Sequence, residues 1–505
     1  MKRNRLSILE KFENKISFFS NNIFFSLLII GIIGLSIRIL FLNVEIPMNS
    51  DNFRYFNVAI NQMTGYSSEE FLLANDGWPY FLSLFFSITP SNNFMDYMAL
   101  QKFLTIGISV LTIIPIYFLA KQFVSKQYAI LSAAIFIFEP RIAQNSLFGI
   151  TEPLYIMALT ISLALIFYKK YYLQYIAFVI LSFAILIRSE GLFLLPIFVV
   201  IVILRSRKNR KIFFHIFIIL IIITSILLPV SIIRSEYLGN DGITARISGG
   251  IDHISKTSDG NQNQMFSIVI NGIINMLKFL SWSQIPHLIF FVPVGLILFI
   301  KTGDKYEKSL ILVAISALIP TIYPYSFASD VRWIFPLYPI FCIMSVYSMR
   351  YFLQKTTKPK CITIVIFSLI IISSIFYLDW KDIDQSRELE LYNLALEISS
   401  KTSMVNVYYP ESSYLNVVGL TKVEKFPIPT NEYLEKNIEQ YWYNETDSII
   451  DDNQNRPQFV KDVLIDENNF PYLIKEFDSL DHNYKYELRI YKIDYEKFYL
   501  INNKN

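Results

Sequence analysis

The sequence predicts an α-helical, multi-pass membrane protein with a small extracytoplasmic α/β domain at its C-terminal end. The first observation is composition: apolar residues make up 53% of the 505 residues and charged residues only 17%, against about 25% charged residues in an ordinary soluble protein. The second is the division of charge. From Asp379 onward there are 24 acidic and 14 basic side chains, whereas the preceding part has 18 acidic and 31 basic ones. Two physically different regions therefore share the chain.

This composition also excludes several classes of protein. The apolar content excludes a disordered protein, a nucleic-acid-binding module and most soluble enzymes. The chain has two cysteines, Cys342 and Cys361, which excludes a disulfide scaffold and a cysteine-based zinc site.

The N-terminal region is expected to cross a membrane about eleven times between residues 23 and 378. A bilayer core of about 30 Å is crossed by roughly 20 apolar residues in a helix. The expected spans are Ile23–Leu42, Tyr97–Ala120, Tyr128–Phe138, Pro153–Tyr168, Tyr171–Ile187, Leu192–Leu204, Ile212–Ile233, Ile285–Ile300, Leu310–Tyr325, Trp333–Tyr351 and Ile362–Leu378. An odd number of spans places the two termini on opposite sides of the membrane.

The distribution of Lys and Arg sets the orientation, because these residues stay on the cytoplasmic side near span ends. Alternate loops are rich in them, beginning with Lys2, Arg3 and Arg5, whereas the stretch from Asn43 to Asn93 has Arg54 as its single basic residue. We therefore expect residues 1–22 in the cytoplasm, the chain after Asp379 outside, and the protein in the cell membrane.

Two long outer loops, residues 43–95 and 234–284, contain apolar residues at helical spacing. The first loop has Phe53, Phe56, Ile60 and Met63 on one face. The second repeats the pattern from Met265 to Leu280. Both segments are expected to form helices in the plane of the interface or packed loop helices.

The region 379–505 has shorter apolar runs that alternate with polar residues, and about 125 residues suffice for one α/β core. The expected strands are Val405–Tyr409, Tyr414–Val418, Phe459–Ile465 and Tyr486–Ile493. The expected helices are Asp384–Ser399, Glu432–Tyr443 and Pro471–Phe477.

Charged residues collect at the outer ends of the expected spans. They are Asp51, Arg54, Glu139, Arg141, Glu152, Arg188, Glu190, Arg234, Asp330 and Arg332. Charged groups at membrane depth are costly and need a function or a partner. Their position at one mouth indicates a site for an anionic lipid head group and a soluble second substrate, whereas snorkelling and local pairing, such as Arg188 with Glu190, is the structural alternative.

Five short motifs resemble those of membrane transferases that use lipid-linked sugars, namely the protein O-mannosyltransferases and the aminoarabinose transferase of lipid A. Their order along the chain is that of the family. They are Ser50-Asp51-Asn52-Phe53-Arg54-Tyr55, Gly77-Trp78-Pro79-Tyr80-Phe81-Leu82, Thr151-Glu152-Pro153-Leu154-Tyr155, Ile187-Arg188-Ser189-Glu190-Gly191-Leu192 and Arg332-Trp333-Ile334-Phe335-Pro336-Leu337-Tyr338-Pro339.

The resemblance implies the GT-C membrane glycosyltransferase fold, a polyprenyl (dolichyl)-phosphate sugar donor and inversion at the sugar carbon. The acceptor could be a protein, a glycan or a lipid. Asn52 stands where the family has Glu, and Trp78 where it has Pro, so the acceptor is not implied.

The chemistry fits the same residues. A lipid phosphate leaves as a stable anion, so one carboxylate that removes the proton of the acceptor hydroxyl is sufficient. We assign the general base to Asp51 and a supporting catalytic role to Glu152. The candidates for the donor phosphate are Arg332, Arg54, Arg188 and Arg234, because guanidinium groups match phosphate oxygens. The candidates for substrate binding are Tyr55, Trp78, Glu190 and His253.

No cofactor is expected, since relatives that use a lipid monophosphate generally work without metal, although two carboxylates can hold Mg²⁺ or Mn²⁺. Two other function classes stay open: a transporter or flippase of lipid-linked sugars, and a non-catalytic membrane subunit. Donor-dependent sugar transfer separates the enzyme from both.

Overall fold

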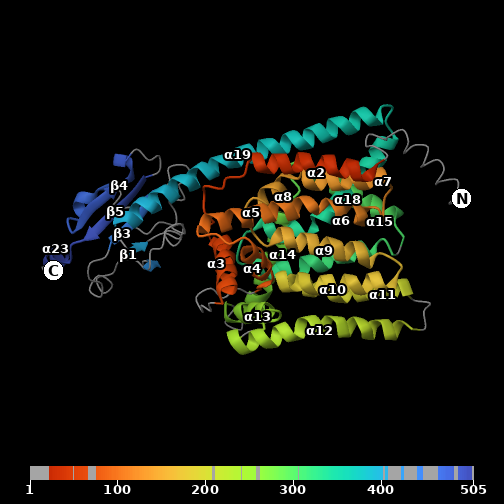
Figure 1. The fold of residues 1–505 in the computed structure, drawn as a ribbon, viewed down its shortest axis with the longest axis horizontal. Helices are drawn as coiled ribbons and strands as arrows, with labels where there is room; N and C mark the ends of the chain where they lie inside the picture. The colour runs from red at the N-terminus through yellow and green to blue at the C-terminus, as the bar shows by residue number, and fades with distance from the viewer. Residues whose placement is uncertain are drawn as a thin grey trace. The chain divides into compact units, whose positions relative to one another are not determined.

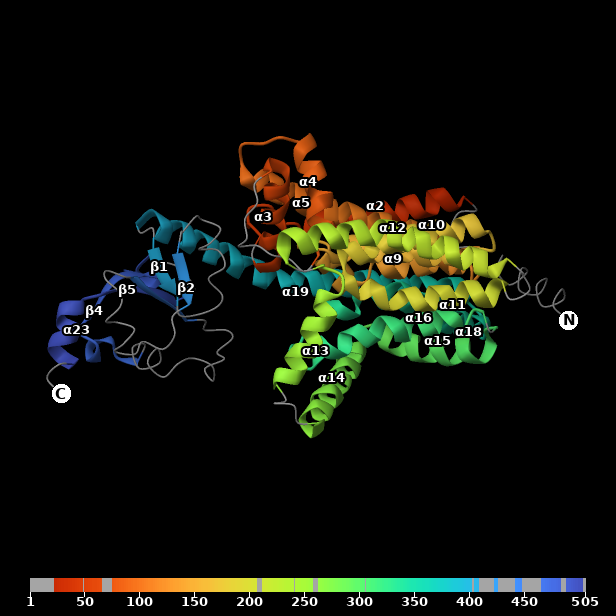
Figure 2. The same cartoon turned by 90° about the horizontal axis from the view of Figure 1, so that it is seen from below.

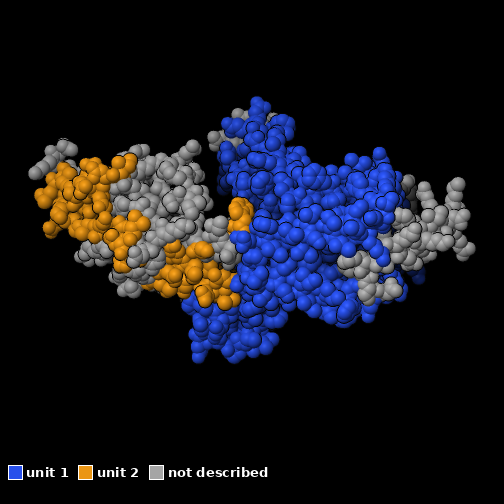
Figure 3. All heavy atoms as spheres, turned by 90° about the horizontal axis from the view of Figure 1, so that it is seen from above, with its two compact units in different colours: residues 1–42, 54–379 blue, residues 43–53, 380–505 orange. Residues whose placement is uncertain are grey.

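The structure, a computed structural model, divides into two compact units (Figure 3). The first comprises residues 1–42 and 54–379, and the second comprises residues 43–53 and 380–505. The structure describes residues 22–48, 50–65, 75–206, 211–239, 241–257, 262–304, 306–401, 404–407, 422–425, 441–446, 465–482 and 487–502.

The first unit is a bundle of apolar helices, most of which run side by side (Figure 1). Every apolar run predicted as a span is largely helical. The bundle helices are α2 (Ile23–Leu40), α5 (Phe94–Leu111), α6 (Ile113–Ala120), α7 (Lys126–Ile137), α9 (Glu152–Ile166), α10 (Tyr171–Ile187), α11 (Leu195–Ser206), α12 (Ile212–Leu238), α15 (Leu288–Thr302), α16 (Ser309–Leu318), α18 (Tyr338–Gln354) and, as far as Asp379, α19 (Pro359–Lys401).

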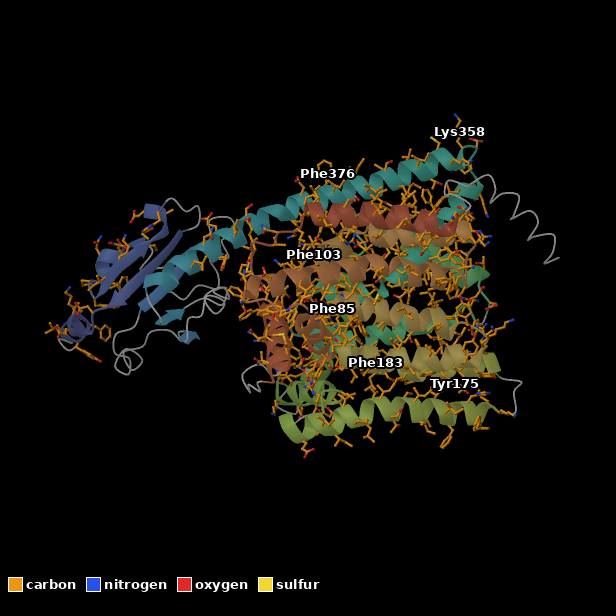
Figure 4. The ribbon with its side chains drawn as sticks, in the orientation of Figure 1. Phe85, Phe103, Tyr175, Phe183, Lys358 and Phe376 are labelled. Atoms are coloured by element: carbon orange, nitrogen blue, oxygen red, sulfur yellow. The ribbon has the colours of Figure 1, made fainter. Side chains whose placement is uncertain are left out.

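Six helices of the described chain are long and apolar enough to cross a membrane. They include α2, α12 and α19, and shorter apolar helices of 10–17 residues accompany them. The bundle exposes many large apolar side chains, such as Phe376 on α19, which is 70% exposed and labelled in Figure 4. Such a surface suits lipid rather than water. The protein is therefore a multi-pass membrane protein, and the number eleven stays a prediction.

Further helices, most of them short, join the bundle helices at the end where α10 and α12 finish and α9 begins (Figure 1). They are α3 (Ser50–Thr64), α4 (Gly77–Ile88), α8 (Pro140–Asn145), α13 (Ala245–Thr257), α14 (Gln262–Trp282) and α17 (Ile322–Tyr325), with the 3-10 helices η2 (Ser189–Leu194), η3 (Ile319–Thr321) and η4 (Val331–Leu337). Helices α13 and α14 project from the bundle (Figure 2).

The helices expected in the two long loops are present as α3 and α14. On α3, Phe56 is buried in the way its apolar face predicts. Helix α14 is also long and apolar enough to be a candidate span. Helix α4 begins at Gly77, the first residue of the second motif, where the family resemblance implies the entry to a loop helix, and its Trp78, Leu82 and Phe86 are buried.

The second unit contains a mixed sheet with the strand order β2-β1-β3-β5-β4. Strand β1 (Met404–Val407) pairs in parallel with β2 (Lys422–Lys425) and β3 (Tyr441–Thr446), and β5 (Glu487–Ile493) pairs antiparallel with β3 and β4 (Leu473–Asp478). The sheet is accompanied by α23 (Tyr495–Asn502).

Two secondary-structure predictions in this unit are wrong. The segment Pro471–Phe477 was predicted as a helix, but most of it forms β4, because its residues pair with β5 from Leu473 onward. The predicted helix Glu432–Tyr443 cannot reach its predicted end, because β3 begins at Tyr441. The predicted strand Tyr414–Val418 and most of Phe459–Ile465 lie outside the described residues.

Candidate functional site

Glu152 begins α9 and is held in place by the backbone that precedes it. The carbonyl of Gly149 accepts hydrogen bonds from the indole Nε1 of Trp78 (3.2 Å) and from Nε2 of Gln101 (2.6 Å). Gly149 has a positive φ of 70°, a conformation that favours glycine. The turn before α9 is thus fixed by α4 and α5, and it places a buried carboxylate in the first turn of a helix, where the helix dipole favours negative charge.

Arg188 joins two carboxylates at the end of α10. Its Nη1 lies 2.6 Å from Oε1 of Glu152, and its Nη2 lies 3.0 Å from Oε1 of Glu190. The side chains of Arg188 and Glu152 are 11% and 4% exposed, and that of Glu190 is 21% exposed. The guanidinium carbon also lies 6.0 Å from the ring centre of Tyr155. We call Glu152, Arg188 and Glu190 the ionic triad.

The triad keeps its central cation charged. Burial lowers the pKa of the Arg188 guanidinium, but Glu190 and Glu152 outweigh this effect, and the pKa lies above its ordinary value. Tyr55 of α3 also acts electrostatically on Arg188. The triad has two carboxylates and one guanidinium, so it has carboxylate oxygens to spare for a ligand. Hydroxyl groups donate hydrogen bonds to such oxygens.

Glu190 also lines a cavity of about 220 Å³. The walls come from η2, α13, η3 and α17, and they are mostly apolar. The lining residues are Ser189, Glu190, Phe193, Gly250, Ile251, Ile254, Ile319, Pro320, Tyr323 and Pro324. A largely apolar cavity with one convergent carboxylate is typical of a small-molecule site.

Arg234, a predicted phosphate ligand, forms an ion pair with Asp76. Asp76 precedes α4, and Arg234 lies near the end of α12, so the pair ties the loop 43–95 to the segment that begins the loop 234–284. Burial raises the pKa of Asp76 above its usual value, and Arg234 opposes that rise. Gly242, with φ of +66°, lies against the Arg234 side chain.

The remaining predicted residues have distinct surroundings. Arg332 donates from Nε to Asp330 Oδ2 at 2.7 Å and is 35% exposed in its side chain. The exposed His253 on α13 contacts the Phe327 ring edge to face, with 4.6 Å between ring centres. Asp51 and Arg54, near the start of α3, are exposed.

The structure brings three of the candidate residues into contact and gives the others different surroundings. It unites Glu152, Arg188 and Glu190, and it shows the pairing of Arg188 with Glu190 that the sequence analysis gave as the structural alternative. Trp78 is fully buried and holds Gly149, so its predicted contact with substrate is not supported. Asp51 belongs to the second compact unit and the triad to the first.

Sequence reasoning missed Gln101, Gly149 and Asp76 as supporting residues. Gln101 offered a signal, since a lone amide inside the apolar run Tyr97–Ala120 needs a buried partner. Asp76 offered none, because its partner lies 158 residues away in the sequence. Within the described part of the chain, no three His, Cys, Asp or Glu side chains converge in a way that could hold a metal ion.

No protein-family model matches the sequence, and no curated protein matches it. Several solved structures do match. ArnT from Cupriavidus metallidurans, bound to undecaprenyl phosphate, is 8% identical over 92% of this chain and 97% of that chain, with a TM-score of 0.55. The Archaeoglobus fulgidus oligosaccharyltransferase in its apo form is 14% identical over 82% of this chain and 61% of that chain, with a TM-score of 0.55.

A further match is AglB from Archaeoglobus fulgidus in complex with an inhibitory peptide and a dolichol-phosphate. It is 12% identical over 80% of this chain and 60% of that chain, with a TM-score of 0.51. The chain spans about three fifths of the length of these oligosaccharyltransferases. It shares the GT-C fold of both groups of membrane glycosyltransferases, as the sequence motifs predict.

Proposed function

We propose that the protein is an integral-membrane, inverting glycosyltransferase. It moves a sugar from a polyprenyl-phosphate donor to an acceptor hydroxyl on the outer face of the membrane. The observation that carries the proposal is the ionic triad beside a cavity in a chain with the GT-C fold. ArnT with that fold binds undecaprenyl phosphate, and AglB binds a dolichol-phosphate, which supports a lipid phosphate as the leaving group.

The chemistry needs one base and a stabilised leaving group. The bond between the sugar carbon and the phosphate oxygen breaks as the acceptor oxygen attacks from the opposite face, through an oxocarbenium-like state. In the proposal the exposed carboxylate of Asp51 takes the acceptor proton. The phosphate departs as an anion, so no general acid is required.

The guanidinium groups have different roles in this scheme. Arg188 has both terminal nitrogens on carboxylates, so it positions Glu152 and Glu190 rather than binding phosphate. Arg234 is likewise committed to Asp76. Arg332 is also paired, with Asp330, but its side chain is about one third exposed. For this reason Arg332 and the exposed Arg54 are the better candidates for stabilising the leaving phosphate.

Glu190 is the group through which the triad meets a substrate. Its carboxylate lines the cavity, where sugar or acceptor hydroxyls can donate hydrogen bonds to it. The walls are mostly apolar, and a hydrogen bond in such surroundings is stronger than one in water.

The test is sugar transfer by the purified protein from a panel of short-chain polyprenyl-phosphate sugars, with a membrane extract as the acceptor. Asp51→Asn should reduce transfer by about 10²- to 10⁴-fold, the range for loss of a general base. Glu45→Gln, at an exposed carboxylate of the same loop, is the matched control and should keep wild-type transfer. Near-normal transfer by a folded Asp51→Asn variant would exclude Asp51 as the base. Translocation of the donor without transfer would identify a flippase instead.

A further inference from the structure

A second buried arginine cluster lies outside the candidate site. Arg141 is on α8 and is 9% exposed. Its guanidinium carbon lies 5.6 Å from the ring centre of Trp282, at the end of α14, and 5.6 Å from that of Tyr377, on α19. We call these three residues the Arg141 cluster. They all belong to the first compact unit.

The Arg141 guanidinium is poorly matched by its protein neighbours. Its two hydrogen bonds are long, at 3.5 Å to the Tyr377 hydroxyl and 3.3 Å to the Trp282 carbonyl. Its buried Nε has no acceptor among the described residues. No carboxylate in the described part of the chain lies within ion-pair distance of it. A buried cation without a counter-charge is costly.

Arg38 shows how this bundle satisfies an arginine that has only a structural role. It is 1% exposed, and all three of its nitrogens have acceptors. Nε donates to Ser146 at 3.0 Å, Nη1 to the carbonyls of Gly34 and Ile137 at 3.0 Å each, and Nη2 to Ser109 at 3.4 Å. Arg141 differs because its Nε and its charge are both unmatched.

Glu139, two residues before Arg141 in the sequence, forms no ion pair with it in the described part of the chain. Glu139 is 1% exposed and its carboxylate accepts a hydrogen bond from the Ile142 amide at 2.9 Å. Burial raises the pKa of Glu139 to about 8, against the opposing effects of that amide and of Arg141. Burial therefore disfavours the charged form of this carboxyl.

We propose that the Arg141 cluster binds a phosphate group, as a second anion site distinct from the ionic triad. The guanidinium offers the directional N–H donors that phosphate oxygens accept. Trp and Tyr side chains are typical of the membrane interface, where lipid phosphates lie, and basic pockets between membrane helices bind anionic head groups. Two sources share this chemistry: the phosphate of a membrane lipid and free inorganic phosphate.

Trp282 is 55% exposed, and its ring centre lies 5.6 Å from the guanidinium carbon of Arg141, so an anion that reaches this guanidinium changes the surroundings of the indole. Binding of an anion at the Arg141 cluster can therefore be followed through Trp282. The tryptophan fluorescence of the full-length protein should change on binding, and Trp282→Phe should remove that change. The chain has five tryptophans, so the difference between wild type and Trp282→Phe isolates the signal.

The experiment uses the full-length protein in nanodiscs of phosphatidylcholine, with and without phosphatidic acid, and a parallel titration with inorganic phosphate. Phosphatidic acid should raise Tm and change the Trp282 signal in the wild type, because a ligand that binds only the folded state stabilises it. Arg141→Gln should lose both responses, and Arg141→Lys should bind at least about tenfold more weakly, because the directional donors are lost. A response to inorganic phosphate alone would identify the ion as the source.

The matched control is Arg350→Gln, since Arg350 also lies over a tyrosine ring, that of Tyr128 at 5.9 Å. It should respond as the wild type does. An unchanged response in Arg141→Gln, or an unchanged affinity in Arg141→Lys if Arg141→Gln does not fold, would overturn the proposal. The absence of any response in the wild type would overturn it as well. Arg332→Lys should keep the Trp282 signal, so the experiment tests the Arg141 cluster separately from the proposed donor site.

Discussion

Asp76 and Arg234 form an ion pair between the start of α4 and the end of α12. The partners are 14% and 8% exposed in their side chains, and they belong to segments that are far apart in the sequence. The pair therefore fastens the loop 43–95, which supplies Trp78 to the support of Glu152, to the helix that leads into α13 and the cavity wall. The ion pair thus connects the two long loops that the sequence analysis predicted separately.

Breaking the Asp76–Arg234 pair should destabilise the protein. Removal of one partner leaves the other charge buried and uncompensated, which costs about 3 kcal/mol or more for a buried pair. Asp76→Asn and Arg234→Gln should each lower Tm in detergent, and the double variant should lower it by clearly less than the sum of the two. Strict additivity in this double-mutant cycle would show that the two side chains do not interact.

Glu152→Gln should reduce sugar transfer without unfolding the protein. The amide keeps the shape of Glu152 but removes one of the two carboxylates that hold Arg188, so the guanidinium shifts towards Glu190 and the electrostatics of the cavity wall change. We expect kcat to fall by about 10²-fold, the usual effect of one preorganised electrostatic group.

The control for Glu152→Gln is Glu45→Gln, which removes an exposed carboxylate and should leave kcat unchanged. If Glu152→Gln raised only the KM for the donor, Glu152 would be a substrate-binding residue rather than part of the catalytic electrostatics.

Arg332→Lys tests whether a guanidinium binds the donor phosphate. Arg332 already presents Nε and Nη2 to Asp330, and a lysine keeps the charge but loses the planar pair of donors. The donor KM should rise about tenfold or more, with a smaller change in the acceptor KM. Arg350→Lys is the matched control on the same chain. A donor KM equal to that of the wild type would remove Arg332 from the site.

The helical part of the fold could be predicted from the sequence because long apolar runs are typical of membrane helices. The apolar runs, including Ile212–Ile233, form helices as predicted. The helix α4 is implied by the family resemblance alone, since its Gly77 and Pro79 and the polar residues before it are typical of a loop. In the second unit, Pro471–Phe477 has no strict alternation, and its strand depends on pairing with β5, which no local pattern reveals.

In the candidate site, too, the contacts between residues close in the sequence could be predicted, and those between distant residues could not. Arg188 and Glu190 are two residues apart, and the structure shows the pairing that the sequence analysis gave as the structural alternative for them. The link from Arg188 to Glu152 spans 36 residues and depends on how α9 packs on α10. The motifs placed both residues at one end of the bundle, but only the three-dimensional structure shows that Arg188 is committed to carboxylates.

The stability of the protein should fall as the pH rises from about 5 towards 8, and Glu139 should cause part of this fall. Burial raises its pKa from the ordinary 4.5 to about 8, so the folded protein binds this proton more tightly than the unfolded chain does. The linked stability is complete below about pH 4.5 and is lost as the pH passes 8. The groups that act on Glu139 or respond to it are Arg38, Arg141, Tyr338 and Cys342.

Glu139→Gln should flatten this dependence, because the amide has no proton to lose. The measurement is Tm between pH 5 and 9 for wild type, Glu139→Gln and the exposed control Glu45→Gln, over which the control should follow the wild type. A wild-type slope that persists in Glu139→Gln would assign the dependence to another group.

Gly77→Ala should destabilise the junction between α4 and α10, whereas Gly107→Ala should not. A Cβ on Gly77 would lie 2.7 Å from the carbonyl oxygen of Leu186 and 2.8 Å from the amide nitrogen of Ile187. Both are backbone atoms that cannot turn aside, and Arg188 follows them directly. The added methyl must therefore push α4 away from the residue that centres the ionic triad.

Gly107 provides the comparison because it lies inside α5 and no described atom comes within 4 Å of a Cβ built on it. Alanine there should be neutral or stabilising by up to about 1 kcal/mol, since glycine disfavours a helix interior. Gly77→Ala should lower both Tm and the rate of sugar transfer, and Gly107→Ala should lower neither. Equal behaviour of the two variants would mean that the close approach of α4 to the end of α10 does not position Arg188.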